Sequence, residues 1–388
     1  MTISKQKAIL ISVIAFFVGA AVTCGVLAII LAGVGNYTLA DKTYFNEAKG
    51  FYDKYRDLAI VDGAIDDYYY IDTSDIDKVN PAAKAVVDAL DDPYSAYMTK
   101  AEYENYIAST EGSYSGCGIV FSKDEDGNYV VVNIYEGSPA DKSSDIQPGD
   151  FILKVDGKSY DDQDVMAANI RGDKGSKVKI QYEHEGKKNT VELVRDDIVV
   201  TSVKSEVRDD GLGYIAISEF LAKTGEEFDK AFKKLQDSGC DKIILDLRNN
   251  GGGLVDQAVH IADTFIDSGY ITCTVDRNGD KHEYKSDSDK SDVQLVVLVN
   301  ENSASSSEIL AGALQDNGYK LVGQKTFGKG IIQSSMELDD GSAIKLTIAQ
   351  YLTPDGHKVH KKGLKPDYDV KNGEKGDAQL NQAVKLLK

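Results

Sequence analysis

The pattern of hydrophobic and polar positions changes several times along the chain, and each change predicts a different kind of element. Residues 8–34 carry no charged side chain, a run long enough to cross a bilayer as a helix. From about residue 42 to 109 the pattern is helical, with residues 82–90 as its clearest amphipathic piece. Near Glu111 it gives way to short alternating strands separated by glycine turns. From Gly211 onward buried strands alternate with helices, so we expect a multidomain protein of α/β and α+β class.

The apolar N-terminal run predicts a transmembrane helix that is retained as an anchor. Lys5 and Lys7 precede it, which places the N-terminus on the cytoplasmic side and the rest of the chain outside. A cleaved signal peptide is the alternative, because residues 38–40, Thr-Leu-Ala, are a tolerable cleavage site. Signal peptides have apolar regions of only ~7–15 residues, so the length favours an anchor. The expected location is the cell membrane, with a single span and the larger part extracytoplasmic.

The charge of the chain argues against a nucleic-acid-binding protein, and its cysteine spacing argues against a disulfide-rich or metal-binding one. Lys and Arg number 44 and Asp and Glu number 63, which gives a net charge of −19. An acidic chain without a basic stripe is a poor nucleic-acid binder. The four cysteines are dispersed and match neither a disulfide framework nor a metal-binding spacing. We therefore expect no metal, no other cofactor and no nucleic-acid partner.

Two polar segments directly follow buried strands in the C-terminal half. The strand at residues 242–247 leads into Arg-Asn-Asn-Gly-Gly-Gly at 248–253, and the strand at 294–299 leads into a serine cluster at 303–307. In a parallel sheet the carboxyl ends of the strands carry the catalytic loops. Both segments are therefore candidates for a site. The alternative for the serines is an ordinary helix N-cap with its flanking loop.

A lysine is the best candidate for the base that a serine nucleophile needs. None of the five histidines has a spacing typical of a catalytic base. Lys329 stands between two glycines beside apolar residues, and burial there would lower its pKa toward neutrality. Gln333 would orient the amine, although in an extended strand the two Cα atoms would be ~13 Å apart, so contact needs a bend. The oxyanion would be bound by Gly252 or Gly253 and by the amide after the nucleophile.

Residues 101–196 resemble a PDZ domain. The glycines at 116 and 118, the helix start Ser-Pro-Ala at 138–140 and the strand led by Pro-Gly-Asp at 148–150 occur in the order typical of that fold. The resemblance implies that an extended peptide adds as a strand, with Gly116, Gly118 and Ile119 receiving its terminal carboxylate. An ordinary hairpin turn is the alternative for the two glycines.

Taken together, the motifs resemble the carboxyl-terminal processing proteases, also called tail-specific proteases. The matching segments are residues 91–98, 246–253, 303–316 and 326–333. The resemblance implies a crotonase-like core with Ser305 as nucleophile, Lys329 as base and Gln333 as its orienter. Ser306 then supplies the second oxyanion amide. This sequence departs from the usual pattern at Ser306, at Gly251 and in a segment one residue shorter near 317–319.

The resemblance also implies an organisation and a function. The expected regions are an anchor at 1–40, a helical region at 41–100, the PDZ domain at 101–196, the protease core at 197–370 and a C-terminal helix at 371–388. The expected activity is serine endoproteolysis near protein C-termini, with the PDZ domain recognising tails and gating the site. Arg171 matches a position linked to that coupling, and a homodimer is expected. A catalytically silent PDZ scaffold is the rival interpretation.

Overall fold

The structure, a computed structural model, describes residues 42–124, 127–160, 163–287, 290–373 and 376–388. The chain divides into two units, one ending at Val79 and one beginning at Asn80. The described part of the first unit is helix α2 (Lys42–Tyr68) and the turn after it, which Lys78 closes through 2.6 Å ion pairs. The predicted anchor at 8–34 lies outside the described residues. Among the residues that are described, no helix is long and apolar enough to cross a membrane.

The second unit opens with elements that the helical pattern of the sequence only partly predicts. Helices α3 (Val79–Asp88) and α4 (Lys100–Glu111) flank a short strand, β1 (Ala96–Met98). The helical pattern of the sequence predicted the helices of this segment but gave no indication of β1. This strand pairs with the distant strand β17 (Ala343–Leu352), and three residues are too few to show an alternating pattern.

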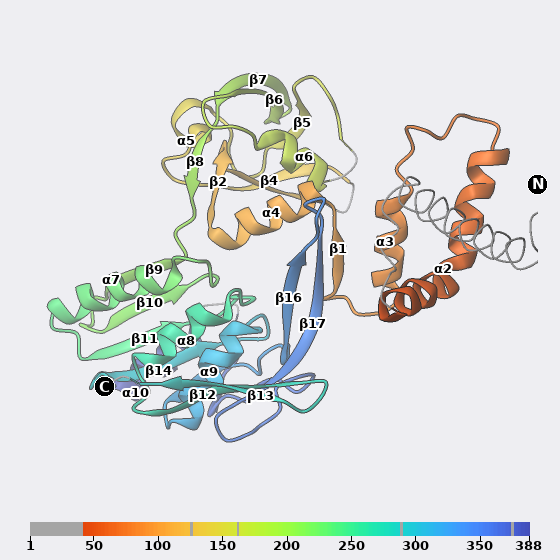
Figure 1. The fold of residues 1–388 in the computed structure, drawn as a ribbon. Coiled ribbons are helices and arrows are strands. Elements are labelled where there is room, and N and C mark those ends of the chain that lie inside the picture. The colour runs from red at the N-terminus through yellow and green to blue at the C-terminus, as the bar shows by residue number, and fades with distance from the viewer. Residues whose placement is uncertain (1–41, 125–126, 161–162, 288–289, 374–375) are drawn as a thin grey trace, which may run out of the picture. The chain divides into compact units, whose positions relative to one another are not determined.

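A five-stranded antiparallel sheet and two helices follow (Figure 1). The strand order is β3-β4-β5-β6-β7, and a separate pair joins β2 to β8. The elements are β2 (Ser113–Gly116), β3 (Ile119–Lys123), β4 (Tyr129–Ile134), α5 (Pro139–Ser143), β5 (Phe151–Val155), α6 (Gln163–Ile170), β6 (Lys177–His184), β7 (Lys187–Val194) and β8 (Asp196–Val199). The Ser138 side chain caps α5 and Pro139 begins it, as the sequence signal requires.

The C-terminal half is built on a six-stranded sheet in the order β18-β15-β14-β11-β10-β9, parallel except for β9. Its strands are β9 (Val203–Val207), β10 (Gly213–Ile217), β11 (Lys242–Asp246), β14 (Gln294–Val299), β15 (Lys320–Gly323) and β18 (Tyr368–Asp369). Its helices are α7 (Thr224–Asp237), α8 (Val255–Asp263), α9 (Ser306–Asp316) and α10 (Ala378–Leu387).

Helices cover both faces of this sheet, which explains why its central strands are uniformly apolar. Ile243 and Leu245 of β11 belong to the larger core, which they share with α7, α8 and α9. Ile244 between them belongs to a smaller core under α10, together with Leu387. The carboxyl ends of β11 and β14 are in register as parallel neighbours, so the segments that follow them emerge side by side.

A second, antiparallel sheet carries the lysine segment. Its order is β1-β17-β12-β13, and β16 (Ile331–Glu337) also pairs with β17. The remaining strands are β12 (Gly269–Asp276) and β13 (Lys281–Ser286). Figure 1 shows β1 beside the long hairpin formed by β16 and β17. Through β1, the segment that precedes α4 pairs with β17, which is also the partner of β16, the strand that begins just after Lys329.

Candidate active site

Ser305 occupies the sharp turn between β14 and α9. It is the N-cap residue of α9, and its backbone has φ 56° and ψ −118°. A positive φ is strained for a residue with a side chain and persists only where the surroundings impose it. A strained turn between a strand and a helix is also the geometry that exposes a nucleophilic serine hydroxyl.

The other serines of the cluster have structural partners. Ser303, Ser306 and Ser307 are fully buried, and their hydroxyls donate at 2.7, 2.7 and 2.9 Å to backbone carbonyls in residues 247–253. Ser305 is partly exposed, and within the described residues its hydroxyl donates no hydrogen bond. The cluster therefore divides into three serines whose hydroxyls donate to the glycine turn and the strand end before it, and one whose hydroxyl proton has no acceptor there.

The glycine turn lies against the backbone of Ser305. A Cβ atom added to Gly252 would stand 2.7 Å from the Ser305 Cβ, so only glycine fits there. The Gly252 N–H donates to the Asn250 side-chain oxygen at 2.8 Å and is therefore occupied. The Gly253 N–H forms no hydrogen bond within the described residues, and Ser306 begins α9, so its N–H has no acceptor in the helix. Of the predicted oxyanion donors, Gly253 and Ser306 are thus available.

A buried carboxylate connects the serine and lysine segments. Glu308 is fully buried, and one of its oxygens accepts the N–H groups of Ser305 (3.0 Å) and Lys329 (2.8 Å). Its other oxygen accepts the Thr326 hydroxyl (2.5 Å) and the Gly328 N–H (2.8 Å). Burial raises the pKa of Glu308, and the four hydrogen bonds act in the opposite direction. This role could not be predicted from the sequence, because Glu308 occupies the ordinary third position of a capping box.

Tyr351 makes a second connection between the same two segments. This side chain is 1% exposed, and its hydroxyl lies 3.1 Å from the Ser305 carbonyl oxygen and 2.9 Å from that of Lys329. Burial raises the pKa of Tyr351 well above its ordinary value, so the phenol keeps its proton and donates. The nucleophile and the predicted base are therefore fixed to one another through their backbones.

The two glycines beside Lys329 are required by a neighbouring loop. A Cβ atom on Gly330 would stand 2.2 Å from the His360 nitrogen, and one on Gly328 would stand 2.9 Å from the Gly363 nitrogen. This close packing buries part of the lysine. Burial lowers the pKa of Lys329, and the charge of Lys345 acts in the same direction. A lowered pKa is what a lysine base requires.

Within the described residues, the side chains of Ser305 and Lys329 form no hydrogen bond to one another. The Lys329 amine lies 4.8 Å from the centre of the Tyr94 ring, and within the described residues it forms no hydrogen bond to Ser305 or Gln333. The predicted bend is present, since the β16–β17 register shifts between Ile332 and Gln333. The Gln333 amide nevertheless donates to the Thr347 hydroxyl at 3.3 Å.

A cavity of about 280 Å³ lies between the PDZ-like sheet and the rest of the unit. Gly118, Ile119 and Arg171 line it, whereas Gly116 lies just outside its lining in β2. The Arg171 guanidinium lies 4.6 Å over the Tyr114 ring and donates to the Asn105 side chain at 2.7 Å. Arg171 therefore contacts α4 as well as the cavity.

The cavity and the glycine turn share one backbone segment. Glu219 and Leu221 line the cavity, and Phe220 lies between them. The Phe220 N–H donates to the Gly252 carbonyl at 2.9 Å, and the Phe220 carbonyl accepts the Leu254 N–H at 2.8 Å. The cavity lining is thus hydrogen-bonded directly to the turn that carries the predicted oxyanion donor.

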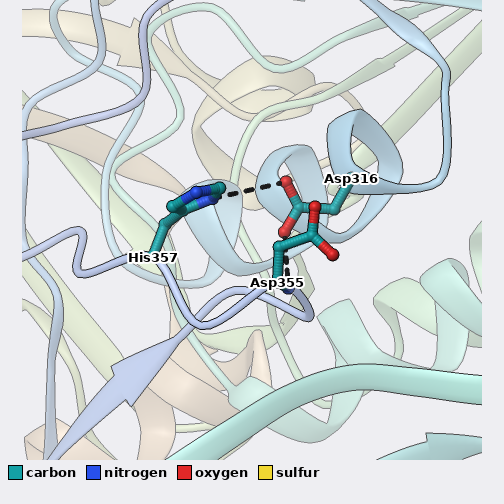
Figure 2. A group of neighbouring side chains, drawn as sticks. All are labelled: Asp316, Asp355 and His357. Carbon is teal, nitrogen blue, oxygen red and sulfur yellow. Dashed lines mark hydrogen bonds and ion pairs between the residues drawn. The ribbon is translucent and has the colours of Figure 1, made fainter.

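A separate polar cluster joins the end of α9 to the turn after β17. Figure 2 shows Asp316, Asp355 and His357, whose possible ligand atoms lie within 4.8 Å of one another. One Asp316 oxygen accepts the Asp355 N–H at 2.9 Å, and the other lies 3.8 Å from the His357 ring nitrogen. The Asp316 carboxylate therefore already has partners within the protein, and we interpret the cluster as a fastening of the turn.

Comparison with known proteins places these features in a family. The model of peptidase family S41 matches residues 211–370, and a PDZ domain model matches residues 115–195. The carboxy-terminal processing protease CtpA of Bacillus subtilis is 40% identical over 304 residues, covering 77% of this chain and 65% of that protein. A probable CtpA-like serine protease of Staphylococcus saprophyticus is 39% identical over 314 residues, covering 79% of this chain and 63% of that protein. The chain thus spans slightly less than two thirds of these relatives.

A solved structure agrees with the sequence relatives. The photosystem II D1 C-terminal processing protease is 30% identical, with a TM-score of 0.52, over 79% of this chain and 85% of that one. The predictions of a PDZ domain and of an α/β protease core are confirmed. Along most of its length the chain resembles carboxyl-terminal processing proteases, and it belongs to peptidase family S41.

Proposed function

We propose that this chain is a membrane-anchored serine endopeptidase that cleaves extracytoplasmic proteins near their C-termini. The observation that carries the proposal is the Glu308 carboxylate, which binds the backbone of Ser305 and that of Lys329 at the same oxygen. If Ser305 served only as the N-cap of α9, no such link between its backbone and that of Lys329 would be needed. Ser305 is also the one serine of its cluster whose hydroxyl donates no hydrogen bond within the described residues.

The proposed reaction begins with proton transfer from Ser305 to Lys329. The neutral Lys329 amine accepts the hydroxyl proton while the Ser305 oxygen attacks the scissile carbonyl carbon. The carbonyl oxygen becomes an oxyanion, and the free N–H groups of Gly253 and Ser306 donate to it. Collapse of this intermediate breaks the C–N bond, and the Lys329 ammonium returns the proton to the leaving amine. Water then hydrolyses the acyl-enzyme by the same steps. Gln333 would orient the amine after leaving Thr347.

In this proposal the PDZ domain supplies both recognition and gating. A substrate tail would add along Ile119, with its carboxylate at the loop of Gly116 and Gly118 and near Arg171. The shared segment around Phe220 supports gating, because it contacts both the cavity and the glycine turn. No cofactor takes part. We further propose a homodimer, and a single N-terminal span that holds the enzyme at the cell membrane with its catalytic part outside the cytoplasm.

The test is cleavage of a loosely folded protein with an apolar C-terminus by the full chain. Ser305→Ala and Lys329→Ala should each lower kcat/KM at least about 10⁴-fold. Lys325→Ala, which removes an exposed lysine of the same turn, is the matched control and should leave kcat/KM unchanged. Activity should rise with pH as Lys329 loses its proton. The midpoint should lie below the ordinary lysine value, because burial lowers this pKa.

The same cleavage assay distinguishes a serine endopeptidase from a catalytically silent PDZ scaffold. Activity that survives Ser305→Ala would move the nucleophile elsewhere. A parent chain that binds apolar C-terminal peptides yet cleaves no protein in their presence would favour the scaffold.

A further inference from the structure

Tyr94 meets the Lys329 amine from a segment far away in the sequence. The ring is partly buried, and its centre lies 4.8 Å from the Lys329 nitrogen. An ammonium over an aromatic face at this distance is stabilised by the negative potential of the ring. Within the part of the chain that the structure describes, the amine has no hydrogen bond or ion pair that would compete with this contact.

The position of Tyr94 is fixed by the segment that carries it. The Asp92 carboxylate accepts the Tyr94 N–H at 3.1 Å and the Ser95 hydroxyl at 2.6 Å. The Ser95 oxygen in turn accepts the Thr347 N–H of β17 at 3.0 Å. The next residue, Ala96, starts β1 and pairs with Lys345 of β17. Tyr94 is therefore held against the lysine by side-chain and strand hydrogen bonds.

The other titratable side chains packed around the Lys329 segment come from several elements. They are Asp92 before β1, Lys345 in β17, Glu308 in α9 and His360 in the loop packed against Gly330. Asp92 favours the ammonium and Lys345 opposes it. Glu308 is occupied by four neutral donors, one of them the N–H of Lys329 itself. Burial and Lys345 lower the pKa of Lys329, Asp92 raises it, and a cation–π contact with the ring acts in the same direction as Asp92.

We propose that Tyr94 is a positioning residue whose ring holds the Lys329 ammonium in a resting position, from which the amine must depart before it can take the Ser305 proton. This inference rests on the function proposed above and concerns the regulation of the same site. The contact favours the charged, inactive form of the base. Substrate binding must therefore overcome it, and the segment before the PDZ domain takes part in holding the enzyme at rest.

Removing the ring while keeping an apolar side chain should ease deprotonation of Lys329. A cation–π contact is worth about 0.5 to 2 kcal/mol, and one pKa unit corresponds to about 1.4 kcal/mol. The pKa of the amine in Tyr94→Leu should thus fall by roughly 0.4 to 1.5 pH units. At a pH below the midpoint, kcat/KM should rise about 3- to 30-fold, since the neutral fraction of the amine rises by that factor.

The first experiment measures the amine directly and needs no catalysis. In the full chain carrying Ser305→Ala, an amine-reactive acylating reagent is applied across a pH series, and modification of Lys329 is quantified by mass spectrometry. Tyr94→Leu should shift the Lys329 titration to lower pH, whereas Tyr94→Phe, which keeps the ring, should titrate as the parent does. Exposed Lys325 in the same samples is the internal control. Tyr94→Met removes the ring in a second way if the leucine variant folds poorly.

The outcomes are distinct. A Lys329 titration in Tyr94→Leu and Tyr94→Met that stays in place or moves to higher pH would overturn the proposal, because the ring would then act only by excluding water. A shift shared by Tyr94→Phe would also overturn it, because the hydroxyl would be responsible. A shift confined to the ringless variants supports it. If those variants show the shift but the chain with Ser305 intact cleaves nothing, the proposed function fails while the assignment of Tyr94 stands.

Discussion

Replacing Glu308 with glutamine tests the connection on which the site depends. All four partners of this carboxylate are donors, and a fully ionised carboxylate accepts at both oxygens. In Glu308→Gln one oxygen becomes an NH₂ group of nearly the same size. The amide oxygen can still accept one pair of donors, but the NH₂ group must face the other pair. Two buried donors then lose their acceptor.

The expected loss of stability follows from that count. Each buried donor left without a partner costs about 1–3 kcal/mol, so two of them cost about 2–6 kcal/mol. The total free energy of unfolding of a domain is only about 5–15 kcal/mol. Whichever pair is lost, either the turn of Lys329 or the backbone between Ser305 and Lys329 is released. A displacement near 1 Å in an active site lowers the rate about 10²-fold, and we expect at least that loss in kcat/KM.

Urea unfolding followed by circular dichroism gives the stability change, and cleavage of the test protein gives kcat/KM. Glu301→Gln makes the same charge change at an exposed position just before the serine cluster and should leave both values unchanged. The urea midpoint of Glu308→Gln should fall with an unchanged slope. If Glu308→Gln unfolded at the parental midpoint and cleaved at the parental rate, the carboxylate would not be binding all four donors.

Three further substitutions address the remaining supports of the site. Tyr351→Phe removes the hydroxyl shared by the two carbonyls; we expect about 1 kcal/mol lower stability and a 10- to 100-fold lower kcat, measured by urea unfolding and single-turnover cleavage. Gly253→Ala would place a methyl group 2.2 Å from the Phe220 carbonyl, so we expect a lower melting temperature and a kcat reduced about 10²-fold or more. Arg248→Ala leaves the buried Asp246 carboxylate without its charged partner, and calorimetry should show about 3–5 kcal/mol lower stability.

The sequence predicted best the parts of the site that follow buried strands. The apolar runs of β11 and β14 identify these strands, and the rule for parallel sheets places the segments at 248–253 and 303–307 at one edge. The sequence alone did not distinguish among the serines. Their burial does so, because only Ser305 among them keeps a partly exposed side chain, and burial depends on how the glycine turn packs.

The contacts that the sequence did not reveal join segments far apart in the chain. Tyr94 reaches Lys329 only because a three-residue strand pairs with β17, and so short a strand has no periodic signal. Tyr351 lies inside an apolar strand, where it resembles an ordinary core residue. Gly328 and Gly330 flank Lys329 in the sequence, but the loop that their backbones approach cannot be named from the sequence.

The arrangement around Glu308 explains how a lysine base and a buried carboxylate can exist side by side. A free carboxylate near the amine would hold Lys329 protonated, which would remove its basicity. Here Glu308 accepts from three backbone N–H groups and one hydroxyl, and these neutral donors disperse its charge without neutralising the lysine. Lys329 contributes its backbone N–H to this set and keeps its amine out of it. One carboxylate can therefore fix the position of the base without fixing its proton, which leaves the protonation state to burial, to Lys345, to Asp92 and, as we propose, to the Tyr94 ring.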